Sequence, residues 1–199
     1  GMLSEWAVMT VPDGLALNWL GAGRYDVKLA DGTAVKIASS GEAWRSGRTE
    51  LRVETAAKDP FTLRVRIPAW AMAPKLLLNG QRIPNVVAGN YAVLKHKWSK
   101  RDKLELSFEM PVRLVAGANE AAGKVSLYRG PLLLAWDQAV NAFDADQIPA
   151  VDMARLGEAR AVVPTQSRSA LASPAWLQVE LPTESGVLRL VDFASAGQN

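Results

Sequence analysis

The sequence predicts an all-β protein made of antiparallel β-sandwiches, two in tandem, with little helix. Three observations lead to this prediction. Apolar and polar residues alternate with a period of two through most of the chain, turn dipeptides separate the alternating runs, and a helical period is almost absent. Strands that recur at intervals of about ten residues, with hairpin signals between them, are typical of sandwiches and barrels.

The alternation is clearest in four runs of the chain. Every second residue is apolar in "LRVE" (51–54), "FTLRVRI" (61–67), "KLELSFEM" (103–110) and "LQVEL" (177–181). Because successive side chains of a strand point to opposite faces of the sheet, each run has one apolar and one polar face. Each run therefore predicts a strand that is buried on one side.

The run from 61 to 67 continues into Pro68 and Trp70. Pro68 has no N–H to donate, so we expect it to end the hydrogen-bond ladder. Trp70 is then expected to fold over the strand end and cover its apolar face. Arg66, on the polar face, is expected to form an ion pair across the sheet or against a neighbouring domain. In the alternative hypothesis, Arg66 and Trp70 belong to a binding site.

Two dipeptides predict tight hairpins. Asp31-Gly32 and Asn79-Gly80 each lie between apolar runs, and Asp-Gly and Asn-Gly tolerate the positive φ angles that such turns need. The best candidate for a helix is "PAVDMARLGEA" (149–159), which is short and is expected to be a connector.

The expected domain organisation is a β-sandwich over residues 1–115 followed by a second region over residues 116–199. The boundary lies at "VAGANEAAG", where the alternation is lost and the residues become small. A further irregular stretch at 140–173 is rich in Ala, Asp, Pro and Ser, and only two clear strands follow it. The second region is therefore either another sandwich or an incomplete C-terminal one.

Composition indicates an ordinary globular protein. Of the 199 residues, 49% are hydrophobic and 22% are charged, and a net charge of +3 is too small to indicate a polyanionic partner. The chain has no cysteine, which excludes disulfides and every cysteine-ligated metal site. No signal peptide and no membrane span can be recognised, and the compartment is left open. Gly1 before Met2 is interpreted as an expression scar.

Candidates for chemistry are few. His96 is the only histidine, lies on the same face as Leu94 and Trp98, and is interpreted as structural. The acids of the irregular region are the remaining candidates for a catalytic pair, and a solvated loop role is favoured for them because no apolar setting would raise the pKa of one of them. Those acids are Asp137, Asp144, Asp146 and Asp152, with Asp192 near the end. The basic run "KHKWSKR" is interpreted as a solvated turn rather than a nucleic-acid site.

Seven tryptophans form the one enriched residue type that has a functional interpretation. Exposed indole faces can stack on sugar rings, although most tryptophans fill cores and sheet seams. Trp44 lies in the glycine-flanked turn "SGEAWRSG", and Trp176 is expected on the polar face of its strand with Gln178 and Glu180. These two are the candidate sugar-stacking residues.

Several phrases that follow one another resemble the C-terminal region of the β-L-arabinofuranosidase-like glycoside hydrolases, family 127. They are the R-I-P-x-W strand end with Arg66, Pro68 and Trp70; the hairpin Asn79-Gly80; "GNYAVLKHKWSKRD"; "MPVRL"; and the R-G-P-L segment with Arg129, Gly130 and Pro131. The resemblance covers most of the chain except about residues 140–173, and these matching residues are interpreted as structural motifs.

The resemblance implies that a helical catalytic barrel precedes β-sandwich domains in the parent polypeptide. The family's nucleophile is a cysteine, held with other cysteines and a glutamate around a zinc ion in that barrel. This chain has no cysteine, so no catalytic residue, metal ligand or cofactor is assigned to it. The resemblance also implies that the first sandwich ends at 110–115.

Three functions remain open at this point. The leading one is a non-catalytic accessory region of a glycoside hydrolase acting on arabinofuranosyl-type glycans, with the catalytic barrel of the same polypeptide as its partner and a homodimer as a further option. The second is a carbohydrate-binding module that holds a glycan through exposed tryptophans. The third is a glycosidase with an acid pair among Asp137, Asp144 and Asp146. Nucleic acid and membranes are not expected as partners.

Overall fold

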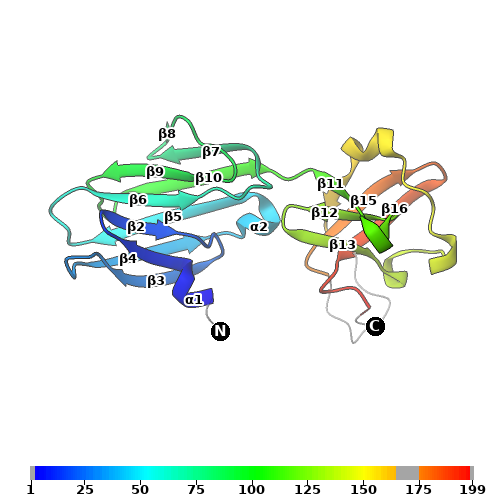
Figure 1. Cartoon of the computed structure of the whole chain (residues 1–199), viewed down its shortest axis with the longest axis horizontal. Helices are drawn as coiled ribbons and strands as arrows, with labels where there is room; N and C mark the ends of the chain where they lie inside the picture. The colour runs from blue at the N-terminus through cyan, green and yellow to red at the C-terminus, as the bar shows by residue number, and fades with distance from the viewer. Residues whose placement is uncertain (1–2, 165–174, 198–199) are drawn as a thin grey trace. The chain divides into compact units, whose positions relative to one another are not determined.

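The computed structural model describes residues 3–164 and 175–197 (Figure 1). The chain divides into two compact units, residues 1–110 and 111–199, and each is described by itself. Both units consist mainly of strands, so the all-β prediction is confirmed. None of the described helices is long and apolar enough to cross a membrane.

The first unit contains a four-stranded sheet of order β1-β2-β6-β9. Its strands are β1 (Val8–Val11), β2 (Gly14–Leu17), β6 (Phe61–Arg66) and β9 (Tyr91–His96). A short helix, α1 (Leu3–Ala7), precedes it. The pair β2–β6 is parallel, whereas every other strand pair of the described residues is antiparallel. The parallel pair was not expected from the sequence, and it arises because the chain crosses to the other sheet between β2 and β6.

The second sheet of this unit has six strands in the order β3-β4-β5-β10-β7-β8. Its strands are β3 (Gly23–Lys28), β4 (Ala34–Ser40), β5 (Arg48–Thr55), β10 (Lys103–Glu109), β7 (Met72–Leu78) and β8 (Gln81–Arg82). The helix α2 (Ala43–Ser46) connects β4 to β5. It ends at Gly47, whose φ of 71° fits the left-handed conformation of helix C-termini.

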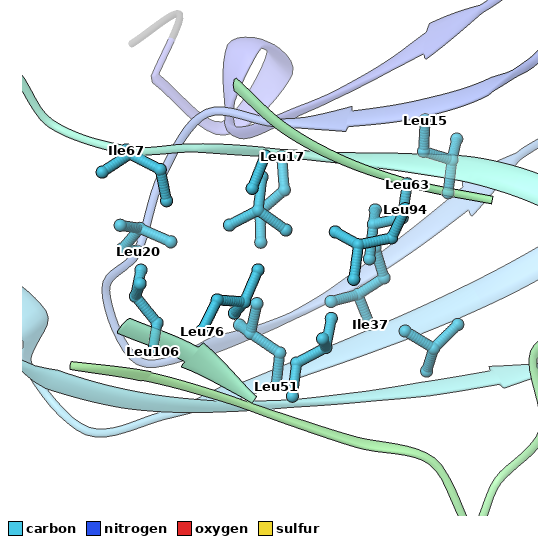
Figure 2. Close-up of a cluster of buried hydrophobic side chains, with 14 of the residues drawn as sticks. Leu15, Leu17, Leu20, Ile37, Leu51, Leu63, Ile67, Leu76, Leu94 and Leu106 are labelled. Carbon is cyan, nitrogen blue, oxygen red and sulfur yellow. The ribbon is translucent and has the colours of Figure 1, made fainter. Parts of the chain in front are cut away.

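The two sheets of the first unit enclose one hydrophobic core. Figure 2 shows Leu15, Leu17 and Leu63 of the four-stranded sheet facing Leu51 and Leu76 of the six-stranded sheet. All five side chains are fully buried. The core positions of β5, β6 and β10 are the apolar positions of the alternating runs, so the period of two correctly predicted which faces are buried.

Both predicted hairpins are present. Asn79 and Gly80 join β7 to β8 with φ angles of 52° and 82°, which are the two positive values of a type I′ turn. Gly32 has a φ of 87° and closes the loop between β3 and β4, where Leu29 N–H donates to the carbonyl of Thr33 at 2.9 Å. Glycine and asparagine are found there because other residues are strained at positive φ.

The second unit contains one six-stranded antiparallel sheet of order β11-β12-β13-β16-β15-β14. Its strands are β11 (Val112–Ala116), β12 (Val125–Arg129), β13 (Leu132–Trp136), β14 (Arg160–Val162), β15 (Gln178–Thr183) and β16 (Gly186–Asp192). Its core is formed by Leu134, Val179, Leu181 and Leu190 among others. Phe143, Val151 and Leu156, from the segment between β13 and β14, pack against this core.

Short 3-10 helices lie in the connections between the strands of the second unit. They are η1 (Asn119–Ala121), η2 (Gln138–Val140), η3 (Ala145–Gln147) and η4 (Met153–Glu158). The expected connector helix at 149–159 thus forms as the 3-10 helix η4. The irregular stretch expected at 140–173 contains η3, η4 and β14, and its residues 165–173 lie outside the described residues.

Candidate functional site

The end of β6 is a structural junction. Ile67 N–H donates to the carbonyl of Asn90 at 2.8 Å, and the carbonyl of Ile67 accepts from Gly89 N–H at 3.0 Å, so the ladder runs to Ile67 and stops at Pro68. Trp70 is half-buried against the core of the first unit and meets Phe108 edge-on, with ring centroids 5.2 Å apart. This geometry matches the covering role predicted for Trp70.

The arginine that forms an ion pair on β6 is Arg64 and not Arg66. Arg64 Nη1 and Nη2 donate to the two carboxylate oxygens of Asp13 at 2.7 and 3.0 Å, a bidentate pair that joins β6 to the turn between β1 and β2. Arg66 is exposed opposite Tyr91, and within the described parts of the chain it has no ion pair. The hydrogen bonding from the Arg64 guanidinium group is the main cause that lowers the pKa of the Asp13 carboxyl.

Asp102 is the buried centre of a polar cluster just before the start of β10. It is 7% exposed and accepts hydrogen bonds from Asn79 Nδ2 at 2.7 Å and from Ser99 N–H at 2.7 Å. His96 Nε2 lies 3.3 Å from its Oδ2. Asn79 Oδ1 in turn accepts from Lys103 N–H at 2.9 Å, so the Asn79-Gly80 hairpin is tied to the adjacent strand.

The hydrogen bonds of this cluster account for the position of His96 beside Asp102 and for the pKa of Asp102. Burial alone would raise the pKa of the Asp102 carboxyl, but the hydrogen bonds from Asn79, Ser99 and His96 together lower it below its usual value. The His96 ring also meets Trp98 edge-on at 5.0 Å. Ser99 belongs to the cluster through hydrogen bonds to Asp102, and the hydrogen bonds of the cluster tie the Asn79-Gly80 hairpin and the turn at Ser99 to β10.

The R-G-P-L segment is the hairpin between β12 and β13. Arg129 pairs with Leu132 across the turn, which leaves Gly130 and Pro131 as its two central residues. Gly130 has a φ of 57°, and the ring of Pro131 fixes a negative φ, which together give the angles of a type II′ turn. Arg129 is half-buried, and this burial lowers its pKa. The nearby Arg113 stacks 4.6 Å above the Tyr128 ring.

The two candidate sugar-stacking tryptophans differ in exposure. Trp44 lies in α2 of the first unit and is half-buried. Trp176 lies in the second unit and is 55% exposed, but it precedes β15 rather than lying within the strand. The prediction of a polar, exposed position is wrong at Gln178, whose side chain is 1% exposed.

Asp192 fixes the backbone beside Trp176. It is 1% exposed; its Oδ2 accepts from Trp176 N–H at 3.0 Å and from Leu177 N–H at 3.1 Å. Its Oδ1 accepts from Ser195 N–H and Oγ at 3.1 and 2.9 Å. Phe193, the next residue, is 64% exposed. Trp176 lies just before β15 and Phe193 just after β16, two strands that are paired antiparallel, so both aromatic residues lie at the same end of this strand pair.

The acids of the candidate catalytic pair lie in different surroundings. Asp137 is 7% exposed, and its two oxygens accept from Ala139 N–H at 2.7 Å and from Gly197 N–H at 2.9 Å. Asp144 and Asp146 are exposed, and Asp144 accepts from Gln138 Nε2 at 2.9 Å. Within residues 3–164 and 175–197, no three His, Asp or Glu side chains gather in a way that could hold a metal ion.

The first unit is thus a two-sheet β-sandwich module whose polar clusters join strands and turns to one another. Residues 14–110 match the family model for the middle domain of GH127 β-L-arabinofuranosidases. This match confirms the resemblance seen in the sequence, and it covers most of the first unit.

Solved structures show the same fold over both units. The chain is similar to a glycoside hydrolase (22% identity, TM-score 0.79), covering 98% of this chain and 35% of that protein. It is also similar to a GH127 β-L-arabinofuranosidase from Geobacillus stearothermophilus T6 (20% identity, TM-score 0.75), covering 96% and 33%. A GH127 β-arabinofuranosidase gives 19% identity and a TM-score of 0.74, covering 92% and 33%. The chain therefore spans about a third of the length of these proteins. A comparison with curated protein sequences finds no match.

Proposed function

We propose that this chain is the accessory β-sandwich region of a glycoside hydrolase and that it supports a catalytic domain in the same polypeptide. The observation that carries the proposal is the coverage: nearly the whole chain aligns with about a third of a glycoside hydrolase. The GH127 middle-domain match over residues 14–110 supports the same assignment. In this role the sandwiches brace a catalytic domain and take no part in bond cleavage.

The proposed substrate of the whole enzyme is an arabinofuranosyl-type glycan. Two of the similar structures are named as β-arabinofuranosidases, and the family model carries the same activity in its description. The catalytic chemistry then belongs to the helical barrel that the resemblance implies. The zinc ion of that chemistry has no ligand set here, because the chain lacks cysteine and its described residues form no metal cluster.

The native mass of the polypeptide tests this proposal. An antibody raised against the chain is used to detect the protein in extracts of its source cells. A product several times heavier than 21.5 kDa is expected. A native product of about that mass, present without a heavier species, would contradict the proposal of a shared polypeptide.

Carbohydrate binding is the second candidate function, and the exposed Trp176 with Phe193 favours it. Two large aromatic side chains, 55% and 64% exposed, lie at adjacent strand ends whose backbone is fixed by the buried Asp192. A rigid pair of aromatic faces suits stacking on sugar rings. Trp44 is the weaker candidate because it is half-buried.

A glycan titration tests this second candidate. We expect saturable quenching of tryptophan fluorescence by a neutral plant glycan, lost in Trp176→Ala and retained in Trp6→Ala, whose side chain is 56% exposed in the other unit. The same titration with Trp44→Ala shows whether the half-buried tryptophan takes part. An unchanged fluorescence across arabinan, xylan and galactan would contradict the binding function.

A further inference from the structure

The outer face of the six-stranded sheet carries a row of cations with a gap in it. Arg24 of β3 pairs with Ala38 of β4, and Ala38 pairs with Arg52 of β5. The side chains of Ala38 and Arg52 point away from the core, because their chain neighbours Ile37 and Val53 are buried and successive residues of a strand face opposite sides. Arg24 shares their register and faces the same way. Neighbouring strands lie about 4.8 Å apart, so the two arginine Cα atoms are separated by about 10 Å with only a methyl group between them.

The gap over Ala38 is a shallow hollow. Its volume is about 390 Å³, in the range of small-ligand sites, and its lining also includes Lys36 and Lys100. Two carboxylates, Asp26 and Glu54, lie at the same hollow, on the outward positions that flank Lys36 in the neighbouring strands. Four cations and two carboxylates give this lining a net charge of +2.

Most of the cations at this hollow lack a protein partner. Arg52 Nη2 lies 2.9 Å from Glu50 Oε1. Across the described ranges, Arg24, Lys36 and Lys100 form no ion pair with a residue of this chain closer than 4.0 Å. Lys103, elsewhere on this face, lies 3.1 Å from Glu105 Oε1 and 3.9 Å from Glu50 Oε2. The lining of the hollow therefore keeps a net positive charge that, among the described residues, no ion pair of Arg24 or Lys100 within 4.0 Å offsets.

We propose that this hollow is a binding site for a uronic acid residue of a glycan. The carboxylate of the sugar would lie over Ala38 between the guanidinium groups of Arg24 and Arg52, which offer planar donor pairs to a carboxylate. The ring hydroxyls would donate to the carboxylates of Asp26 and Glu54. The inference adds an acidic glycan to the proposed accessory function, but its test does not depend on that function.

The lining argues against the other anions. A free phosphate group would satisfy the cations, but it has no sugar ring whose hydroxyls could donate to Asp26 and Glu54. No aromatic ring faces outward in the hollow, since Tyr25 shares the register of the buried Ile37 and Val53, and nucleic acid bases would find no stacking partner. A neutral sugar would leave the guanidinium groups without a partner. A sugar that carries a carboxylate offers an acceptor to the two arginines and hydroxyl donors to the two carboxylates of the lining.

Isothermal titration calorimetry on the full chain tests the proposal. The probes are galacturonic acid and glucuronic acid, with arabinose and glucose as neutral matches and inorganic phosphate as a simple anion. We expect a uronic acid to bind more tightly than the other probes, with an affinity that falls as the salt concentration rises. We expect Arg24→Ala to weaken that binding about tenfold, because one charge-assisted hydrogen-bond pair is lost.

Two further variants make the result specific. Ala38→Glu would place a carboxylate in the gap and abolish binding. Lys75→Ala removes an exposed cation of β7 outside the hollow and should leave the affinity unchanged. Equal binding of uronic acids and phosphate would reduce the site to a general anion site and overturn the proposal. No heat of binding for either uronic acid at millimolar concentrations would overturn it as well, whatever the native mass of the polypeptide.

Discussion

Buried carboxylates in this protein act as anchors for backbone N–H groups. Asp102, Asp137 and Asp192 are all buried, and each accepts hydrogen bonds at the end of a strand or at a turn. A buried charge is tolerated only when its oxygens are hydrogen-bonded, and removing the acceptor leaves the donors unsatisfied. These acids therefore stabilise chain reversals and need no catalytic explanation.

Removal of the Asp102 carboxylate should destabilise the first unit. We expect Asp102→Ala to lower the free energy of unfolding by about 1–3 kcal/mol, because the hydrogen bonds from Asn79 and Ser99 are lost and a space is left at a buried position. Chemical denaturation measures the change. Asp59→Ala, at an exposed position, is the control and should change stability by less than about 0.5 kcal/mol. Equal effects of the two substitutions would contradict the anchoring role.

The same carboxylate makes stability depend on pH in the acid range. The folded-state pKa of Asp102 is lowered below the unfolded value. The stability that the ionised carboxylate contributes is therefore fully present above the unfolded pKa of about 4. The contribution is lost as the pH falls through the lower folded-state value. We expect Asp102→Asn to show a shallower loss of stability than the unmodified chain between about pH 4 and pH 2. Parallel curves for the two proteins, from thermal melts at each pH, would be inconsistent with this assignment.

Glycines show how elements of the sandwich fit together. Gly14 lies at the start of β2, where a Cβ atom would come within 1.9 Å of the carbonyl oxygen of Thr62 on the parallel neighbour β6. Gly32 has a positive φ of 87° but open space around it. The first glycine is required by close backbone approach between strands, and the second by the conformation of its turn.

Substitution of these two glycines separates the two requirements. We expect Gly14→Ala to cost more than about 3 kcal/mol, since the backbone of β2 or β6 must move. Gly32→Ala should cost only about 1 kcal/mol, the strain of a left-handed residue. Equilibrium unfolding in urea measures both. If Gly14→Ala lowered the free energy of unfolding no more than Gly32→Ala does, the close approach of the β2 backbone to the Thr62 carbonyl of β6 would be contradicted.

The predictable elements are those with a local signal. The alternating residues of β5, β6 and β10 and the Asn79-Gly80 turn could be predicted because period and turn chemistry are local properties. The parallel pairing of β2 with β6 depends on distant segments, and no local pattern encodes it. For the same reason Arg64, and not Arg66, pairs with Asp13, which lies 51 residues away in the sequence.

Candidate binding residues were less predictable than strands. The burial of Gln178 and the exposure of Phe193 depend on which strands flank β15 and β16, and alternation alone assigned the wrong side to Gln178. The hollow over Ala38 requires the register of three strands, which a single sequence does not provide. The resemblance to family 127 could be recognised because turn and strand-end phrases keep their order along the chain.

Residues 3–164 and 175–197 form two hydrophobic cores with separate members. All sheet partners of the first unit lie within residues 8–109, and the core residues of the second unit begin at Val112. Each core is closed by strands of its own unit. The first unit should therefore have the contacts that it needs to fold by itself.

A fragment of residues 1–110 tests this independence. We expect it to be soluble and to unfold cooperatively, with Leu63→Ala lowering its stability by about 2–5 kcal/mol because a fully buried leucine is replaced. Thermal melts followed by circular dichroism measure both properties. A fragment without a cooperative transition would show that the first unit depends on residues 111–199.

The most direct test of the account asks whether this chain performs chemistry. The purified 199-residue chain is incubated with an aryl β-L-arabinofuranoside, with and without a chelator, and release of the aryl group is followed. An accessory region without catalytic residues predicts hydrolysis no faster than in buffer under either condition. Hydrolysis that persists with the chelator and disappears in Asp137→Asn, Asp144→Asn or Asp146→Asn would contradict the account and identify an acid pair in the second unit.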